Sequence, residues 1–175
     1  MTTELRYPIG GYEPPADIST DHTDVWIDEI EDLPNALRAA VTPLTDAQLD
    51  TPYRPDGWTV RQLVHHLPDS HINSYIRFKW ALTEERPTIK AYFEDRWAEL
   101  PDSHELPVRY SLDLLDALHQ RWCFLLRNLT EDDLDREMVH PESGPIRLGA
   151  NIGLYAWHGR HHLAHIERLI EREGW

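Results

Sequence analysis

Residues 157–165 read Trp-His-Gly-Arg-His-His-Leu-Ala-His and hold four of the chain's eleven histidines. Residues four positions apart lie one above the other on the same face of an α-helix. His158 and His162 form one such pair, and His161 and His165 form another. Two imidazoles one helical turn apart can bind a single transition metal from one helix. The stretch therefore predicts a metal-binding helix, and it leaves open which pair points inward and which residue supplies a third ligand.

Apolar residues recur at helical spacing over four long segments of the chain, residues 20–41, 59–82, 111–129 and 149–173. This periodicity predicts four long helices, the third of them capped by Ser111. Pro34 and Pro68 fall inside the first two, where a proline bends or splits a helix. Residues 44–50 and 129–135 share a Leu-Thr-acid pattern, which indicates either a repeated helix pair or two ordinary capped turns. The expected fold is an all-α four-helix bundle with short extra helical turns.

The remaining segments are expected to decorate this bundle within a single domain, residues 1–175. Residues 1–19 are rich in proline and glycine, which predicts an extended arm packed on the body or on a partner chain. Residues 83–110 are polar and irregular, with a short helix near residues 92–100, and such a long connection is expected to border a functional pocket. Residues 137–148 predict a small β-hairpin around Pro-Glu-Ser-Gly.

Composition excludes several classes of partner. The formal charge of −14 repels phosphate backbones and anionic lipid, so neither nucleic acid nor a membrane surface is an expected partner. No apolar run approaches the ~18–20 residues that span a membrane, and the N-terminus lacks the pattern of a signal peptide. The single cysteine, Cys123, cannot form an internal disulfide. These features favour a cytoplasmic location and a small-molecule substrate.

Helical periodicity separates the two histidine pairs. His158 and His162 share a face with apolar residues, whereas His161 and His165 share theirs with Trp157 and two arginines and are expected to drift toward solvent. For the inner pair, the alternatives are a metal and hydrogen bonds within the core, because an unpaired buried imidazole costs ~1–3 kcal/mol. The second helix carries His65 and His66, of which only one can point inward because neighbours lie ~100° apart. His66 adjoins the apolar stripe, which favours it as the third ligand.

The predicted set, His66, His158 and His162, contains no thiolate and leaves coordination positions free, which is typical of a catalytic metal site. Gly159 follows His158, so the Glu of the HExxH protease motif is missing. Imidazole ligands suit one divalent transition metal per subunit, such as zinc or nickel. The ligand types do not decide between these metals.

Two stretches, Gly-Trp-Thr-Val-Arg-Gln-Leu-Val-His-His-Leu-x-Asp-Ser-His at residues 57–71 and Tyr-x-Trp-His-x-x-His-His-x-Ala-His-Ile at residues 155–166, are similar to the YfiT proteins of the DinB superfamily. The opening Tyr-Pro-Ile-Gly at residues 7–10 is similar too, so the resemblance covers essentially the whole chain. The resemblance implies a four-helix bundle, a homodimer, and one nickel or zinc ion held by His66, His158 and His162. Pro68 and Gly159 depart from the family pattern without removing a ligand.

Proteins of this family are described as metal-dependent hydrolases without an assigned reaction, and relatives transfer low-molecular-weight thiols such as bacillithiol. Three functions follow as alternatives: a hydrolase that activates a bound water, a thiol S-transferase, and a non-catalytic metal-binding bundle. Asp69 is the candidate base of the hydrolase, although it could equally be a surface or supporting residue. For a thiol cofactor with anionic groups, Arg54, Arg61 and Arg77 are candidate contacts, and each could instead form an ordinary surface ion pair.

Overall fold

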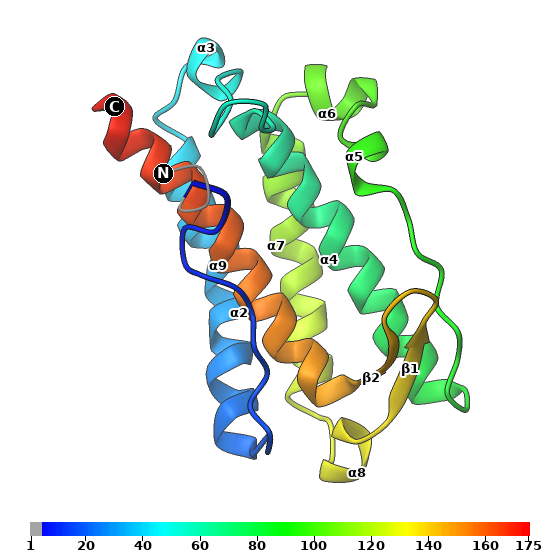
Figure 1. Ribbon diagram of the computed structural model, residues 1–175. Coiled ribbons are helices and arrows are strands. Elements are labelled where there is room, and N and C mark those ends of the chain that lie inside the picture. The colour runs from blue at the N-terminus through cyan, green and yellow to red at the C-terminus, as the bar shows by residue number, and fades with distance from the viewer. Residues whose placement is uncertain (1–4) are drawn as a thin grey trace.

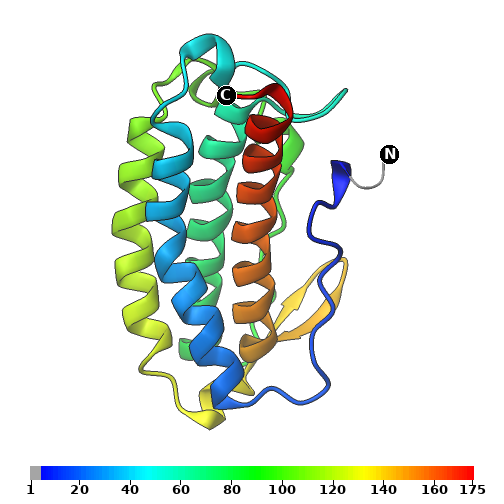
Figure 2. The same ribbon diagram turned by 90° about the vertical axis from the view of Figure 1, so that its left-hand side faces the viewer.

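Four long helices build the protein, α2 (Thr20–Val41), α4 (Val60–Thr83), α7 (Arg109–Leu126) and α9 (Leu148–Glu173). In this computed structural model, which describes residues 5–175, α2 and α4 each pack against both α7 and α9. The four helices therefore close around one core, as Figures 1 and 2 show. The predicted four-helix bundle is confirmed.

Short elements join the long helices, and they are α3 (Asp46–Leu49), α5 (Glu94–Trp97), α6 (Pro101–Glu105), α8 (Glu131–Leu134), β1 (Glu137–His140) and β2 (Gly144–Arg147). The two strands pair antiparallel, which confirms the predicted hairpin. Both Leu-Thr-acid turns are short helices with a capping box, closed by Thr45 in α3 and by Thr130 in α8. Irregular chain, α5 and α6 occupy the segment between α4 and α7 (Figure 1).

The prediction that Ser111 caps the third long helix was wrong, and of the two outcomes predicted at the prolines, bending or splitting, splitting is excluded. Ser111 does not cap α7, which begins at Arg109; instead the hydroxyl of Ser111 lies 2.7 Å from Nδ1 of His65. A proline does not split either helix, because α2 continues through Pro34 and α4 through Pro68. Tertiary packing around these helices outweighs the one backbone hydrogen bond that each proline removes.

The core consists of two apolar clusters with histidines between them. One cluster holds Ile27, Ile30, Phe78 and Trp122 with the first half of α9, and the other holds Leu37, Leu63 and Leu115 with the last half of α9. Along α4, α7 and α9, the buried histidines fall at the boundary between these clusters. A polar layer therefore crosses the middle of the bundle, where the site described below is located.

The described part of the N-terminal arm, residues 5–19, packs on the body of the same chain and runs beside α9 (Figure 2). The indole of Trp157 donates to the carbonyl of Gly10 at 3.2 Å, and Arg168 donates to the carbonyl of Pro8 at 2.9 Å. The hydroxyl of Tyr12 donates to the carbonyl of Ala150 at 3.1 Å. Residues 1–4 of the predicted arm lie outside the described residues.

Among the described residues, no helix is both long enough and apolar enough to cross a membrane.

Trp122 is the largest fully buried side chain, and its ring meets Phe78, Tyr155 and His71 edge to face. We expect Trp122→Ala to lower the free energy of unfolding by about 3–5 kcal/mol, because the substitution leaves a large cavity beside the histidine layer. Phe124 lies on the same helix and is 74% exposed, so Phe124→Ala should change stability by less than about 0.5 kcal/mol. Urea unfolding of both variants tests this contrast, and equal losses would contradict it.

Candidate metal centre

Three histidines from two helices meet at the floor of a cavity. Nε2 of His158, on α9, lies 3.3 Å from Nε2 of His66 on α4 and 3.2 Å from Nε2 of His162 one turn later. The ligand atoms of all three lie within 4.8 Å of one another, a separation at which they could share one ion. The structure thus brings together the three residues that the sequence predicted.

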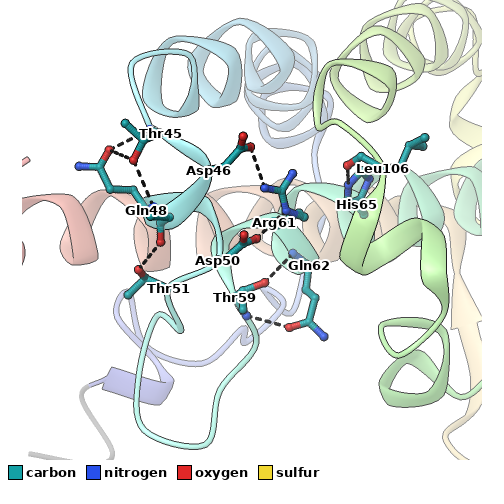
Figure 3. A network of polar contacts seen from close by, with 11 residues as sticks. Thr45, Asp46, Gln48, Asp50, Thr51, Thr59, Arg61, Gln62, His65 and Leu106 are labelled. Atoms are coloured by element: carbon teal, nitrogen blue, oxygen red, sulfur yellow. Dashed lines mark hydrogen bonds and ion pairs between the residues drawn. The ribbon is translucent and has the colours of Figure 1, made fainter.

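Contacts at the start of α4 explain why His66, and not His65, faces this point. Arg61 donates to Asp46 at 2.9 Å and to Asp50 at 2.6 Å, which ties α3 to α4 (Figure 3). His65 turns the other way, with Nε2 2.9 Å from the carbonyl of Leu106 (Figure 3). Because adjacent side chains diverge by ~100°, these contacts direct His66 into the bundle.

Burial keeps the three imidazoles neutral. Loss of solvation lowers the pKa of His66 from 6.5 to about 4. Burial, followed by the neighbouring histidines, lowers the pKa of His158 and of His162 well below 6.5. A neutral imidazole has a free lone pair, which is the form that binds metal. The donor set therefore fits a divalent transition metal at neutral pH.

The cavity above the histidines has a volume of about 510 Å³. Its walls include aromatic rings, basic side chains and acidic side chains, namely Arg6, Tyr7, Tyr53, Arg54, Asp56, Trp58, Ser70, Tyr92, Glu94 and Asp95. Tyr92, Glu94 and Asp95 come from the irregular segment, so the expectation that residues 83–110 border the pocket is confirmed. Burial raises the pKa of Tyr92 to about 12, so its hydroxyl remains a hydrogen-bond donor at neutral pH.

His161 and His165 do not face solvent, which corrects the periodicity argument. Their exposed fractions are 8% and 3%, and their Nε2 atoms lie 3.0 Å apart. Trp157 stacks on His161, the ring of Tyr7 from the arm lies 6.0 Å away, and Tyr53 covers His165 at 4.0 Å between ring centroids. Residues distant in sequence therefore bury a helix face that the helix's own pattern marks as exposed.

These two residues form a second possible ligand group, because His161, His162 and His165 also offer nitrogens within 4.8 Å of one another. The nearby charges favour His66, His158 and His162 as the metal site. The positive charge of Arg54 contributes to the lowered pKa of His165, after burial and His161, and it would repel a cation in the same way. No arginine or lysine contributes to the pKa of His66 or His158.

The other candidate residues are not brought to the three histidines. Asp69 is half-buried and does not line the cavity; burial, with the charge of Asp102 second, raises its pKa to about 6. Arg61 is held by Asp46 and Asp50, and Arg77 donates to the carbonyl of Lys90. Of the three arginines predicted to contact a thiol cofactor, only Arg54 lines the cavity.

Comparison with known proteins gives the family. Residues 29–166 match the DinB superfamily model. The chain belongs to the DinB superfamily. Other members of this superfamily include a protein from Bacillus mycoides strain KBAB4, which is 60% identical over 98% of this chain and 99% of its own length. A protein from Bacillus cereus strain ZK / E33L is 59% identical over the same shares. Both are named provisionally as metal-dependent hydrolases.

Solved structures agree with this assignment to the DinB superfamily. YfiT from Bacillus subtilis is described as a probable metal-dependent hydrolase with an unusual four-helix bundle topology. It is 53% identical to this chain and superimposes with a TM-score of 0.96, covering 98% of this chain and 99% of YfiT. The four-helix bundle protein TT2238 is 18% identical, covers 83% of this chain and 98% of its own, and has a TM-score of 0.58, so it supports the fold alone.

Sequence reasoning gave no role to three residues of the site region. Tyr53 and Tyr92 line the cavity, and His119 lies behind it in the core. His119 could have been noticed, because it is a histidine inside the apolar stripe of residues 112–126. The two tyrosines sit in irregular segments, where no periodic pattern indicates direction.

Proposed function

We propose that this protein is a metal-dependent hydrolase in which His66, His158 and His162 hold one zinc or nickel ion. The observation that carries the proposal is a group of three neutral imidazoles that line one cavity. Nε2 of His158 lies 3.3 Å from Nε2 of His66 and 3.2 Å from Nε2 of His162. A divalent ion held by these residues would polarise a substrate carbonyl and lower the pKa of water. Three histidine ligands would leave coordination positions free for the substrate carbonyl and for the water.

The chain's own residues suit hydrolysis of a small polar substrate. Trp58 lies against His66 and His162 and shields one side of the site from water, at 4.8 Å and 6.4 Å between ring centroids. The Tyr92 hydroxyl is protonated at neutral pH and lines the cavity, so it can donate a hydrogen bond to an oxygen that gains negative charge. Asp69 lies away from the cavity, so the proposal assigns no carboxylate base.

Thiol transfer is the second candidate, and one observation favours it. Arg6 and Arg54 both line the cavity next to the histidines, although the whole chain carries a formal charge of −14. A small thiol with carboxylate groups would pair with them, while its sulfur approached the histidines as thiolate, the reactive form. This arrangement would serve addition of the thiol to an electrophile.

A paired assay separates these two reactions. The purified protein, loaded with zinc or nickel, is incubated first with activated esters and amides in water alone, and then with an electrophile and bacillithiol or glutathione. We expect ester or amide hydrolysis that Tyr92→Phe slows by roughly 10-fold or more through loss of one donor. Adduct formation that depends on the thiol, with no hydrolysis, would instead support the transferase. Absence of both reactions in the metal-loaded protein would leave the non-catalytic metal-binding bundle.

A further inference from the structure

We infer that His71 and His119 are positioning residues, which together with Pro34 fix the proton of His158 on Nδ1 and so keep its Nε2 lone pair facing the cavity. The role of this proton in metal binding rests on the function proposed above. The tautomer of His158 can be measured whether or not the protein binds metal. The residues that set this proton, His71 and His119, lie behind the three histidines in the core.

A row of three contacts, two of them buried and the one at His158 partly buried, leads from the site to helix α2. Nδ1 of His158 lies 3.2 Å from Nε2 of His71, and Nδ1 of His71 lies 2.8 Å from Nε2 of His119. Nδ1 of His119 lies 2.5 Å from the carbonyl oxygen of Ile30. The row crosses from α9 through α4 and α7 to α2, so all four helices of the bundle contribute one member.

Pro34 explains why the carbonyl of Ile30 is available at the end of this row. In an α-helix the carbonyl of residue 30 accepts from the N–H of residue 34. Pro34 has no N–H, so this carbonyl has no donor within α2. His119 supplies the missing donor from α7, which also explains how α2 tolerates a buried proline without breaking.

The direction of every hydrogen bond follows from that carbonyl. A carbonyl oxygen only accepts, so the proton of His119 must be on Nδ1. In a neutral ring Nε2 of His119 then accepts, which requires the proton of His71 on Nδ1. By the same step, Nε2 of His71 accepts from Nδ1–H of His158. The lone pair of His158 is thereby left on Nε2, the atom nearest to His66 and His162.

The surroundings hold these rings neutral and in place. His71 is 0% exposed and His119 is 1% exposed. Burial lowers the pKa of His119 to about 4, so this ring carries no second proton at neutral pH. A charged ring at the fully buried position of His71 would lose its solvation at a high cost in free energy. Trp122 and Tyr155 meet the ring of His71 edge to face, which restricts its rotation. Metal-binding histidines generally need such a partner on the other nitrogen to set tautomer and orientation.

The first test reads the protons directly. In metal-free protein labelled with nitrogen-15, long-range proton–nitrogen NMR spectra assign the tautomer of each histidine at neutral pH. We expect a proton on Nδ1 and a free lone pair on Nε2 in His158, His71 and His119 alike. A proton on Nε2 of His158 would overturn the inference, whether or not the protein binds metal.

The second test uses two substitutions at position 119. His119→Leu removes both the donor to Ile30 and the acceptor for His71, and we expect zinc affinity, measured by competition with a coloured chelator, to fall about 10–100-fold. His119→Gln retains one acceptor and one donor on the same side chain, so it should recover most of that loss. Equal zinc affinity in wild type and a folded His119→Leu would overturn the inference.

Pro34→Ala serves as a further test if His119→Leu does not fold. The new N–H at residue 34 competes with His119 for the carbonyl of Ile30, and no histidine is altered. We expect a mixture of tautomers at His119 and His158 and a weaker affinity for zinc. Wild-type tautomers and affinity in this variant would contradict the role given to Pro34. Failure of wild-type protein to bind zinc or nickel would overturn the proposed function, while the tautomers would still decide the present inference.

Discussion

His158→Ala is expected to abolish stoichiometric metal binding. Nε2 of His158 lies 3.3 Å from that of His66 and 3.2 Å from that of His162, so His158 contacts both other proposed ligands and its removal leaves only two imidazoles for the ion. Loss of a supporting partner already costs about 10–100-fold in affinity, and loss of a ligand should cost more. Metal content after exhaustive dialysis, together with chelator competition for zinc, measures the effect.

His161→Ala is the matched control, because it removes a buried histidine from the same helix. It disables the second group, His161, His162 and His165, but leaves His66, His158 and His162 intact. We expect this variant to retain near-stoichiometric metal. Metal lost from His161→Ala and kept by His158→Ala would move the site to the second group. Wild-type protein without metal would remove the proposed function altogether.

The free energy of unfolding of the metal-free protein should begin to fall once the pH drops below about 6.5. In the folded state, burial lowers the pKa of His119 to about 4 and that of His165 to about 3. In the unfolded chain, where both rings are solvated, each has the ordinary histidine pKa of 6.5. Between these values the unfolded state binds more protons than the folded state. The free energy of unfolding therefore has its full value above pH 6.5 and falls as the pH is lowered toward about 4. Each such histidine lowers the free energy of unfolding by up to about 1.4 kcal/mol for every pH unit in this range.

Urea unfolding at intervals between pH 7.5 and pH 4 checks this dependence. His119→Gln removes one of the titrating groups while keeping the hydrogen bonds, so its curve should be flatter than that of wild type by about one proton. Parallel curves for the two proteins would show that His119 does not take up a proton on unfolding. Stability that rose as the pH fell would contradict the sign of the whole prediction.

Much of the fold could be predicted because its signals are local. The four long helices follow from apolar periodicity, and their observed ends lie within a few residues of the predicted ones. The exception at α7 is informative, since Ser111 is a good cap by composition but contacts His65 from inside the helix. A cap preference worth ~1 kcal/mol yields to a contact that satisfies a buried imidazole.

By itself, the sequence determined the bundle and the choice of the three histidines proposed as ligands. The spacing of His158 and His162 within an apolar stripe, and the place of His66 beside another, are properties of single helices, and the structure brings the three residues together. Only the tertiary structure decided what surrounds them. The arm and Tyr53 bury His161 and His165, and the cavity excludes Asp69 and Arg61. The carbonyl left free by Pro34 receives His119 from another helix. Apolar periodicity predicts on which face of its own helix a side chain lies. It does not predict which distant segment of the chain covers that face, and the contacts above depend on that segment.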